Sequence, residues 1–257
     1  MKNFFEDNKG RLVEEESAIL DKKGIVDEYS MGSIRVKCAN IVGEEHESIG
    51  YGRGRYVSAD CKNAEDGDIV DALGKLLGEM IIAQGNGGKI LCCGIGNPYV
   101  ACDSLGAKTI ERLTKMRPDR LVLTVAMPEG LTGISSSQVI KALVEAKGVE
   151  TCIIIDSLSA KSNDRIGTTY QFTDSGIVPG SAIGCKNSLN QATLGIPVLA
   201  IGVPTVIRAK YLGVIEDKIS DVLFAPRDVD VVVESVSDVL SKTIIRAVSG
   251  IFGGVTT

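Results

Sequence analysis

One stretch decides the fold: Lys89-Ile-Leu-Cys-Cys-Gly-Ile-Gly-Asn-Pro-Tyr-Val-Ala-Cys-Asp103. It begins as an apolar run, which is the pattern of a buried strand, and it breaks at Gly94 and Gly96, which permit a tight turn. From Ser104 to Met116 the apolar residues follow helical spacing. Asp103 therefore stands between a core strand and a helix start, near the sheet edge where open α/β folds bind ligands. A carboxylate there either caps the helix or takes part in chemistry, and this stretch leaves both open.

Strand and helix patterns alternate along the rest of the chain, as in βαβ units, and they predict one α/β domain over residues 1–257. Residues 1–33 form a polar N-terminal segment, part helix and part loop, and residues 43–55 a mobile loop rich in glycine and charge. We expect strands at 33–41, 56–59, 121–125, 152–156, 168–172 and 197–202, and helices at 69–83, 138–147 (capped by Ser136 and Ser137) and 228–248.

Composition excludes several classes of protein. A net charge of −5 over 257 residues argues against general nucleic-acid binding, which needs a basic face. No apolar run approaches the roughly 18–20 residues that cross a membrane, and the N-terminus lacks an apolar signal core. The seven cysteines form no CxxC pair, and Cys92, Cys93 and Cys152 lie in expected strands as small apolar residues. We expect a cytoplasmic protein that binds neither nucleic acid nor membrane.

The inventory of reactive residues is short. His46 is the only histidine, in a charged segment typical of a solvated surface, so a histidine-rich zinc site is excluded and a carboxylate magnesium site is not. No G-x-S-x-G turn, Walker motif or third dinucleotide-binding glycine is present. Cys102, beside Asp103 and near a helix N-terminus, is expected to have a lowered thiol pKa but has no histidine partner.

Two acids follow central strands: Asp103 after the first and Asp156 at the end of 152–156. Because the carboxyl ends of parallel strands meet at one edge, the two carboxylates can face each other, share one proton and activate a water molecule. Each is also a candidate helix cap. The loop over 172–184 is dense in glycine and small hydroxyls; either its amides hold a peptide or it is an ordinary connection. Thr205 follows the strand at 197–202 and is expected at the same edge.

Several motifs in one order resemble the germination protease family of spore-forming bacteria. They are Gly94-Ile-Gly-Asn97, Asp103-Ser-Leu-Gly106, Leu131-Thr-Gly133, Ile155-Asp-Ser-Leu-Ser-Ala160, Thr173-Asp-Ser-Gly-Ile-Val-Pro-Gly180, Leu194-Gly-Ile-Pro-Val-Leu-Ala-Ile-Gly-Val-Pro-Thr205 and Phe224-Ala-Pro-Arg-Asp-Val-Asp230. The resemblance covers residues 85–250 well and 30–85 loosely. It implies an α/β fold related to the hydrogenase-maturation endopeptidases, and we expect a three-layer sandwich with a mostly parallel central sheet and helices on both faces.

The resemblance also implies a function. The family degrades small acid-soluble spore proteins during germination, is made as a zymogen and is typically a homotetramer, which places this chain in the spore core or forespore. The family's proposed catalytic aspartates fall on Asp103 and Asp156, and no cofactor or metal is expected. Two alternatives stay open: a metal-dependent maturation-type endopeptidase, and a non-enzymatic sporulation protein of the same fold. The residues expected to bind substrate are Asn97, Asp174, Ser175, Gly176 and Thr205.

Overall fold

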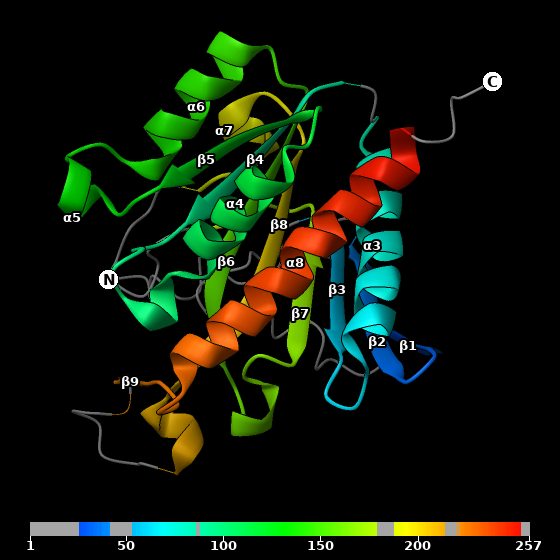
Figure 1. The fold of residues 1–257 in the computed structure, drawn as a ribbon, viewed down its shortest axis with the longest axis vertical. Coiled ribbons are helices and arrows are strands. Elements are labelled where there is room, and N and C mark those ends of the chain that lie inside the picture. Colours follow the sequence, from blue (N-terminus) through cyan, green and yellow to red (C-terminus); the bar gives the residue numbers. More distant parts are fainter. Residues whose placement is uncertain are drawn as a thin grey trace.

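The computed structural model describes residues 26–41, 53–85, 88–178, 188–213, 220 and 222–252. Most of the expected mobile loop, His46, and the first 25 residues lie outside these ranges. The strands are β1 (Asp27–Met31), β2 (Ile34–Ile41), β3 (Gly54–Asp60), β4 (Ile90–Ile95), β5 (Leu121–Ala126), β6 (Thr151–Ala160), β7 (Thr169–Thr173), β8 (Val198–Arg208) and β9 (Leu223–Phe224). The helices are α3 (Asp66–Ala83), α4 (Leu105–Met116), α5 (Glu129–Thr132), α6 (Ser136–Lys147), α7 (Gln191–Leu194) and α8 (Val229–Phe252), with short 3-10 turns that include η2 (Ala101–Asp103) and η5 (Ala209–Leu212) (Figure 1).

The described strands form one mixed sheet in the order β1-β2-β3-β7-β8-β6-β4-β5, and β9 pairs with the end of β8. Only the pairings of β4 with β5, β4 with β6, and β6 with β8 are parallel. The prediction of a mostly parallel sheet was therefore wrong. Short connections explain the difference: a two-residue turn joins β1 to β2, and residues 161–168 join β6 to β7 without an α-helix, so these strands reverse direction.

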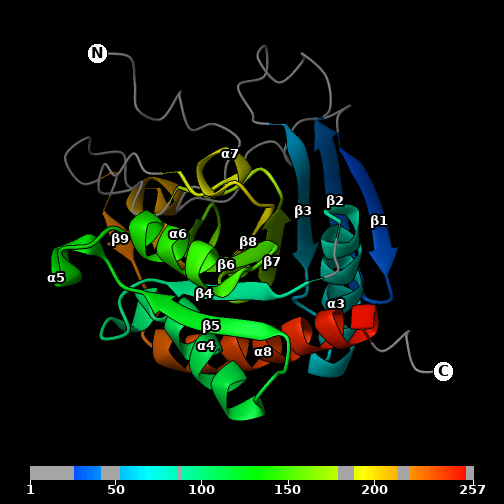
Figure 2. The same cartoon turned by 90° about the horizontal axis from the view of Figure 1, so that it is seen from above.

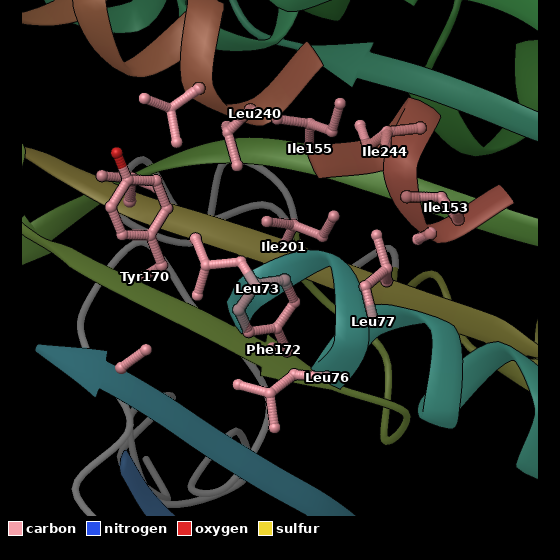
Figure 3. Packing of buried hydrophobic residues seen from close by; sticks show 14 of the residues in the cluster. Leu73, Leu76, Leu77, Ile153, Ile155, Tyr170, Phe172, Ile201, Leu240 and Ile244 are labelled. Carbon is pink, nitrogen blue, oxygen red and sulfur yellow. The ribbon is translucent and has the colours of Figure 1, made fainter. Parts of the chain in front are cut away.

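Helices pack on both faces of the parallel strands (Figure 2). On one face α3, α4 and α8 close over the larger core, where Leu73 and Leu77 of α3 meet Phe172, Ile201 and the β6 isoleucines (Figure 3). On the other face α6 and α7 contribute to a second core with alternate residues of β4, β6 and β8. The small cluster on that face of β2 and β3 contains no helical residue. The α/β class is confirmed, whereas the three-layer description stays a prediction.

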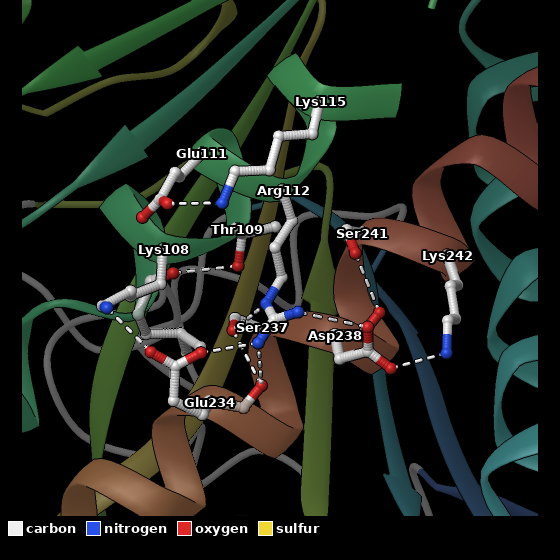
Figure 4. Close-up of polar contacts among 11 residues, drawn as sticks. Lys108, Thr109, Glu111, Arg112, Lys115, Glu234, Ser237, Asp238, Ser241 and Lys242 are labelled. Atoms are coloured by element: carbon white, nitrogen blue, oxygen red, sulfur yellow. Dashed lines mark hydrogen bonds and ion pairs between the residues drawn. The ribbon is translucent and has the colours of Figure 1, made fainter. Parts of the chain in front are cut away.

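A polar joint fastens α8 to α4 beside the larger core (Figure 4). The Arg112 guanidinium of α4 donates to Ser237 Oγ at 2.9 Å and forms ion pairs with Glu234 and Asp238 of α8. Lys108 also pairs with Glu234, at 2.7 Å. The joint holds α4 in place, and α4 follows directly on the turn that carries Asp103.

Most expected elements exist, and three differences bear on function. The last part of the expected polar segment forms β1, an edge strand. The cap of α6 is Ser135, in a capping box with Gln138, and not Ser136 or Ser137. Strands β6 and β8 continue to Ala160 and Arg208, beyond their expected ends. The division into one domain stays a prediction.

Candidate active site

Two glycines bring the end of β4 into direct contact with α4. A Cβ atom on Gly94 would lie 2.2 Å from the Gly106 carbonyl oxygen, and one on Gly106 would lie 2.5 Å from the Ile95 amide nitrogen. Real Cβ atoms do not approach so closely, so both positions require glycine. This packing allows the loop after β4 to fold back over the strand end.

Asp103 lies in that loop and is held by its own turn. Asn97 N–H donates to Asp103 Oδ2 at 2.7 Å, and Tyr99 N–H donates to the Asn97 side-chain oxygen at 3.0 Å. Gly96 has a φ of +121°, and a Cβ there would lie 2.1 Å from the Asp103 carbonyl oxygen. The N-cap of α4 is Ser104, and the Asp103 carboxylate accepts a hydrogen bond from the turn, so of the two alternatives left open by the sequence the helix cap does not apply to Asp103.

Burial raises the pKa of the Asp103 carboxyl, and the hydrogen bond from Asn97 opposes this only in part. A half-buried carboxyl with a raised pKa keeps its proton to higher pH than a surface aspartate does. Such a group is suited to proton transfer, and a perturbed acid at the edge of a sheet is a reason to look for an active site there.

Thr205 of β8 holds the same turn through a hydrogen bond. Its side chain is fully buried, and its hydroxyl donates to the Cys102 carbonyl oxygen at 2.6 Å. Thr205 lies inside β8, at the β-bulge opposite Leu158 and Ser159 of β6. It was expected to follow a strand and to contact substrate. The structure makes it a residue that positions the main chain next to Asp103.

Asp156 lies in the middle of β6, not at its end as expected, and therefore caps no helix. It is 4% exposed, and its Oδ1 accepts the Ser157 N–H at 2.8 Å. By strand alternation its side chain shares a face with Ile154 and Leu158, which belong to the core under α6 and α7. β6 continues past its apolar run, Cys152–Ile155, and the serines that follow, Ser157 and Ser159, are buried as well.

Strand register brings the two acids to one end of the sheet. Gly94 pairs with Ile155, so Asp156 lies one residue further along β6, beside the last residue of β4. Asp103 contacts Gly96, the next residue after β4. The acids reach this edge from different faces: η2 packs on the side of α8, and Asp156 faces the other core.

Asp174, Ser175 and Gly176 lie at the opposite end of the parallel strands from Asp103 and Asp156. They follow β7, which runs antiparallel to β8 and ends at Thr173 opposite Ala200, near the start of β8. Asp174 accepts the Arg55 N–H at 2.6 Å and the Gln84 side-chain amide at 2.9 Å, which ties β3 to the end of α3. The structure does not bring these three residues together with Asp103 and Asp156.

Three cysteines that lie in described strands are core residues. Cys92, Cys93 and Cys152 are fully buried, as expected, and burial raises the pKa of Cys93 to about 12. The expectation of a lowered pKa at Cys102 was wrong, because burial and the neighbouring Asp103 charge both raise it. Among the described residues no group of three or more His, Cys, Asp or Glu side chains is placed to hold a metal ion.

Sequence reasoning missed the buried hydroxyls near the acids. The side-chain oxygens of Ser157 and Ser159 are buried and make no hydrogen bond with another residue in the described ranges. In the sequence, only the polar and apolar alternation of Asp156-Ser-Leu-Ser159 points to these hydroxyls. A half-exposed strand shows the same pattern, so the sequence does not reveal that they are buried.

The fold and the site define an α/β protein with a carboxylate-bearing loop at the carboxyl edge of its parallel strands. Residues 2–224 match the family model described as germination protease. The germination protease of Bacillus velezensis is 34% identical over 204 residues, 71% of this chain and 55% of that protein. That of Clostridium perfringens is 33% identical over 196 residues, 68% and 60% respectively. The chain belongs to the germination protease family, and it spans between about half and three fifths of the length of these relatives.

Among solved structures, the [NiFe] hydrogenase maturation protease HycI from Thermococcus kodakarensis aligns with a TM-score of 0.41 and 18% identity. The alignment covers 66% of this chain and 99% of HycI. No helix in the described ranges is both long and apolar enough to cross a membrane.

Proposed function

We propose that this chain is an endopeptidase in which Asp103 and Asp156 share one proton and direct a water molecule at a peptide carbonyl. The observation that supports the proposal is strand register, which puts Asp156 beside the end of β4, the strand that leads into the loop of Asp103, a half-buried carboxyl of raised pKa. Membership of a family whose relatives are named germination proteases supports it.

In this proposal we assign the shared proton to Asp103, whose pKa is raised by burial, and Asp103 donates a hydrogen bond to the carbonyl oxygen of the scissile bond. Asp156 takes a proton from water as the water oxygen bonds to the carbonyl carbon. When the tetrahedral intermediate collapses, the C–N bond breaks and the amine leaves with the proton that Asp156 accepted.

The substrate and assembly are proposed on the family resemblance. The substrates would be small acid-soluble spore proteins, cleaved in the cytoplasm of the spore by a homotetramer that is made as a zymogen and needs no cofactor. The three-layer sandwich rests on the same resemblance. Of the expected substrate contacts, only Asn97 belongs to the turn that holds Asp103. Contacts of substrate with Asp174, Ser175 and Gly176 stay a prediction.

The test is cleavage of a purified small acid-soluble spore protein by the wild type, Asp103→Asn and Asp156→Asn. Loss of a proton-transfer group costs about 10²- to 10⁴-fold in rate, and we expect each variant to fall in that range. Asp60→Asn is the matched control, because it makes the same change in a half-buried aspartate of β3, which pairs with Arg35 and is no part of the candidate site. It is expected to retain the wild-type rate.

Four other outcomes have different meanings. Equal losses in all three variants would indicate damage to the fold, which thermal unfolding would reveal. Wild-type cleavage that stops with EDTA would favour the metal-dependent alternative. An inactive wild type that stays inactive after removal of residues 1–15 would favour the non-enzymatic alternative, and activation by that removal would indicate a precursor.

A further inference from the structure

Exposed apolar side chains gather at the edge that carries Asp103. Of the thirteen large apolar residues exposed in the described ranges, only Tyr29, Ile82 and Met116 lie elsewhere. The other ten follow the carboxyl ends of β4, β5 and β8 or begin α8, and Figure 2 shows β9 and α5 at this end of the sheet. They are Tyr99, Val100, Leu131, Ile134, Tyr211, Leu212, Val222, Leu223, Phe224 and Val231. Surfaces that expose apolar residues together commonly bind other polypeptides.

Within this group β9 offers a specific mode of binding. Ala209 N–H donates to the Val222 carbonyl, and the pairs Arg208–Leu223 and Ile207–Phe224 follow. Hydrogen-bonded and non-hydrogen-bonded pairs alternate in an antiparallel ladder, so the Leu223 N–H and C=O point away from β8. In the described part of the chain no strand pairs with that outer edge. Within the described residues, the Leu223 N–H and C=O therefore have no strand partner on that side, and they lie between the exposed side chains of Val222 and Phe224.

The position of β9 links it to the candidate active site. β9 pairs with Ile207 and Arg208, which follow Thr205 by two and three residues on the same strand. At roughly 3.3 Å per residue, the paired end of β8 lies about 7–10 Å beyond the threonine that supports the Asp103 turn. Tyr99, the most exposed of the ten at 85%, lies on the loop of Asp103 itself. An extended chain of a few residues spans this distance.

We propose that the outer edge of β9 is the docking strand for the polypeptide substrate, which adds to the sheet as an extended segment with apolar side chains over Val222 and Phe224. This mode supplies main-chain hydrogen bonds for affinity and side-chain contacts for selectivity. A second copy of the chain is the less favoured occupant, because β9 is only two residues long and a stable dimer buries ~800 Å² per partner. The inference rests on the proposed function and names its substrate class: an unfolded, apolar-containing segment.

The test compares Leu223→Pro with Leu223→Ala in an Asp103→Asn background, which is expected to turn over substrate at least about 100-fold more slowly than the wild type. Proline removes only the outward N–H and leaves the bonds from Val222 and Phe224 to β8 intact. The probe is fluorescently labelled, reduced and carboxymethylated α-lactalbumin, a permanently unfolded chain, and its Kd is measured by anisotropy. We expect at least a tenfold rise in Kd for Leu223→Pro and at most threefold for Leu223→Ala.

A second pair of variants guards against a folding defect at β9. The double variant Val222→Ser with Phe224→Ser removes the apolar contacts, and Ile82→Ser with Met116→Ser makes the same kind of change at the other edge. Only the first pair is expected to weaken probe binding, and in the active enzyme it is expected to raise KM with kcat unchanged.

The outcomes separate this inference from the proposed function. Probe binding that depends on Leu223 without any cleavage would overturn the endopeptidase and keep the docking strand. Cleavage with KM and Kd unchanged in every β9 variant would overturn the docking strand and keep the endopeptidase. Loss of self-association in sedimentation velocity, with unchanged probe binding, would assign the edge to a second copy. A wild type that neither binds nor cleaves would overturn both.

Discussion

Asp103 and Thr205 are joined through one main-chain carbonyl, and this link decides what a substitution at Thr205 does. Thr205→Val keeps the shape but removes the hydroxyl that donates to Cys102 O. A buried carbonyl left without its donor costs about 1–3 kcal/mol, and the turn that holds Asp103 loosens with it. We expect urea unfolding to show that loss, and kcat to fall. Thr205→Ser restores the donor and is expected to recover both, and equal values for valine and serine would contradict the positioning role.

The raised pKa of Asp103 predicts how stability changes with pH. A carboxyl whose folded pKa exceeds its unfolded value, near 4, binds its proton more tightly in the folded state. Its contribution to stability is therefore present at low pH and is lost as pH rises through the folded pKa. Asp103→Asn cannot ionise, so its free energy of unfolding should rise relative to the wild type between pH 4 and 7. Denaturant titrations at three pH values measure this difference, and a constant difference would contradict it.

At the scale of elements, the β4–η2–α4 unit depends on main-chain contact. Gly96→Ala places a Cβ within 2.1 Å of the Asp103 carbonyl oxygen at a φ of +121°, and we expect a loss of about 2 kcal/mol or more in unfolding free energy. Gly67→Ala is the control, since no atom lies within 4 Å of a Cβ there and alanine favours the helix by up to about 1 kcal/mol. Unfolding of both variants in urea tests this, and a tolerated Gly96→Ala would show that the turn is looser than described.

The limits of sequence prediction are also clearest at this scale. The helices α3 and α8 and the starts of β4, β6 and β8 follow from hydrophobic periodicity, because their apolar residues face continuous cores. The ends of β6 and β8 do not, because Ser159 and Thr205 are polar yet buried beneath other elements. Periodicity records which residues are apolar, and only tertiary packing decides which polar ones are covered.

At the scale of the whole molecule, the strands differ in how well they are buried, from an exposed edge to a buried centre of the sheet. β1 is an edge strand with four of its five residues exposed, whereas every residue of β6 and β8 is buried. Local opening is easiest where few apolar contacts hold a strand. We expect hydrogen–deuterium exchange to be at least about 100-fold faster in peptides from β1 than in peptides from β6. Equal rates would show that the sheet opens as one unit.

The order and direction of the strands in the sheet could not be predicted from the sequence. The two acids could be predicted as site candidates because each follows the apolar run of a parallel strand. Helices connect these strands, and such connections give the strands the same direction. Asp174 was expected beside Thr205 because both follow strands. However, β7 pairs antiparallel between β3 and β8, and this reverses the end at which Asp174 emerges. Which strands pair depends on contacts between residues far apart in the chain, and no local pattern encodes them.

The three glycines around the Asp103 turn have a consequence for how this site would look in a saturation-mutagenesis experiment. Gly94, Gly96 and Gly106 contribute no side-chain atom to the chemistry, yet any replacement forces main-chain atoms apart. In a map of tolerated substitutions they would rank beside the two acids. A search for reactive groups based on such a map alone would count five essential positions, of which we propose that only Asp103 and Asp156 transfer protons. The steric positions can be told apart because alanine would be as harmful there as any larger residue.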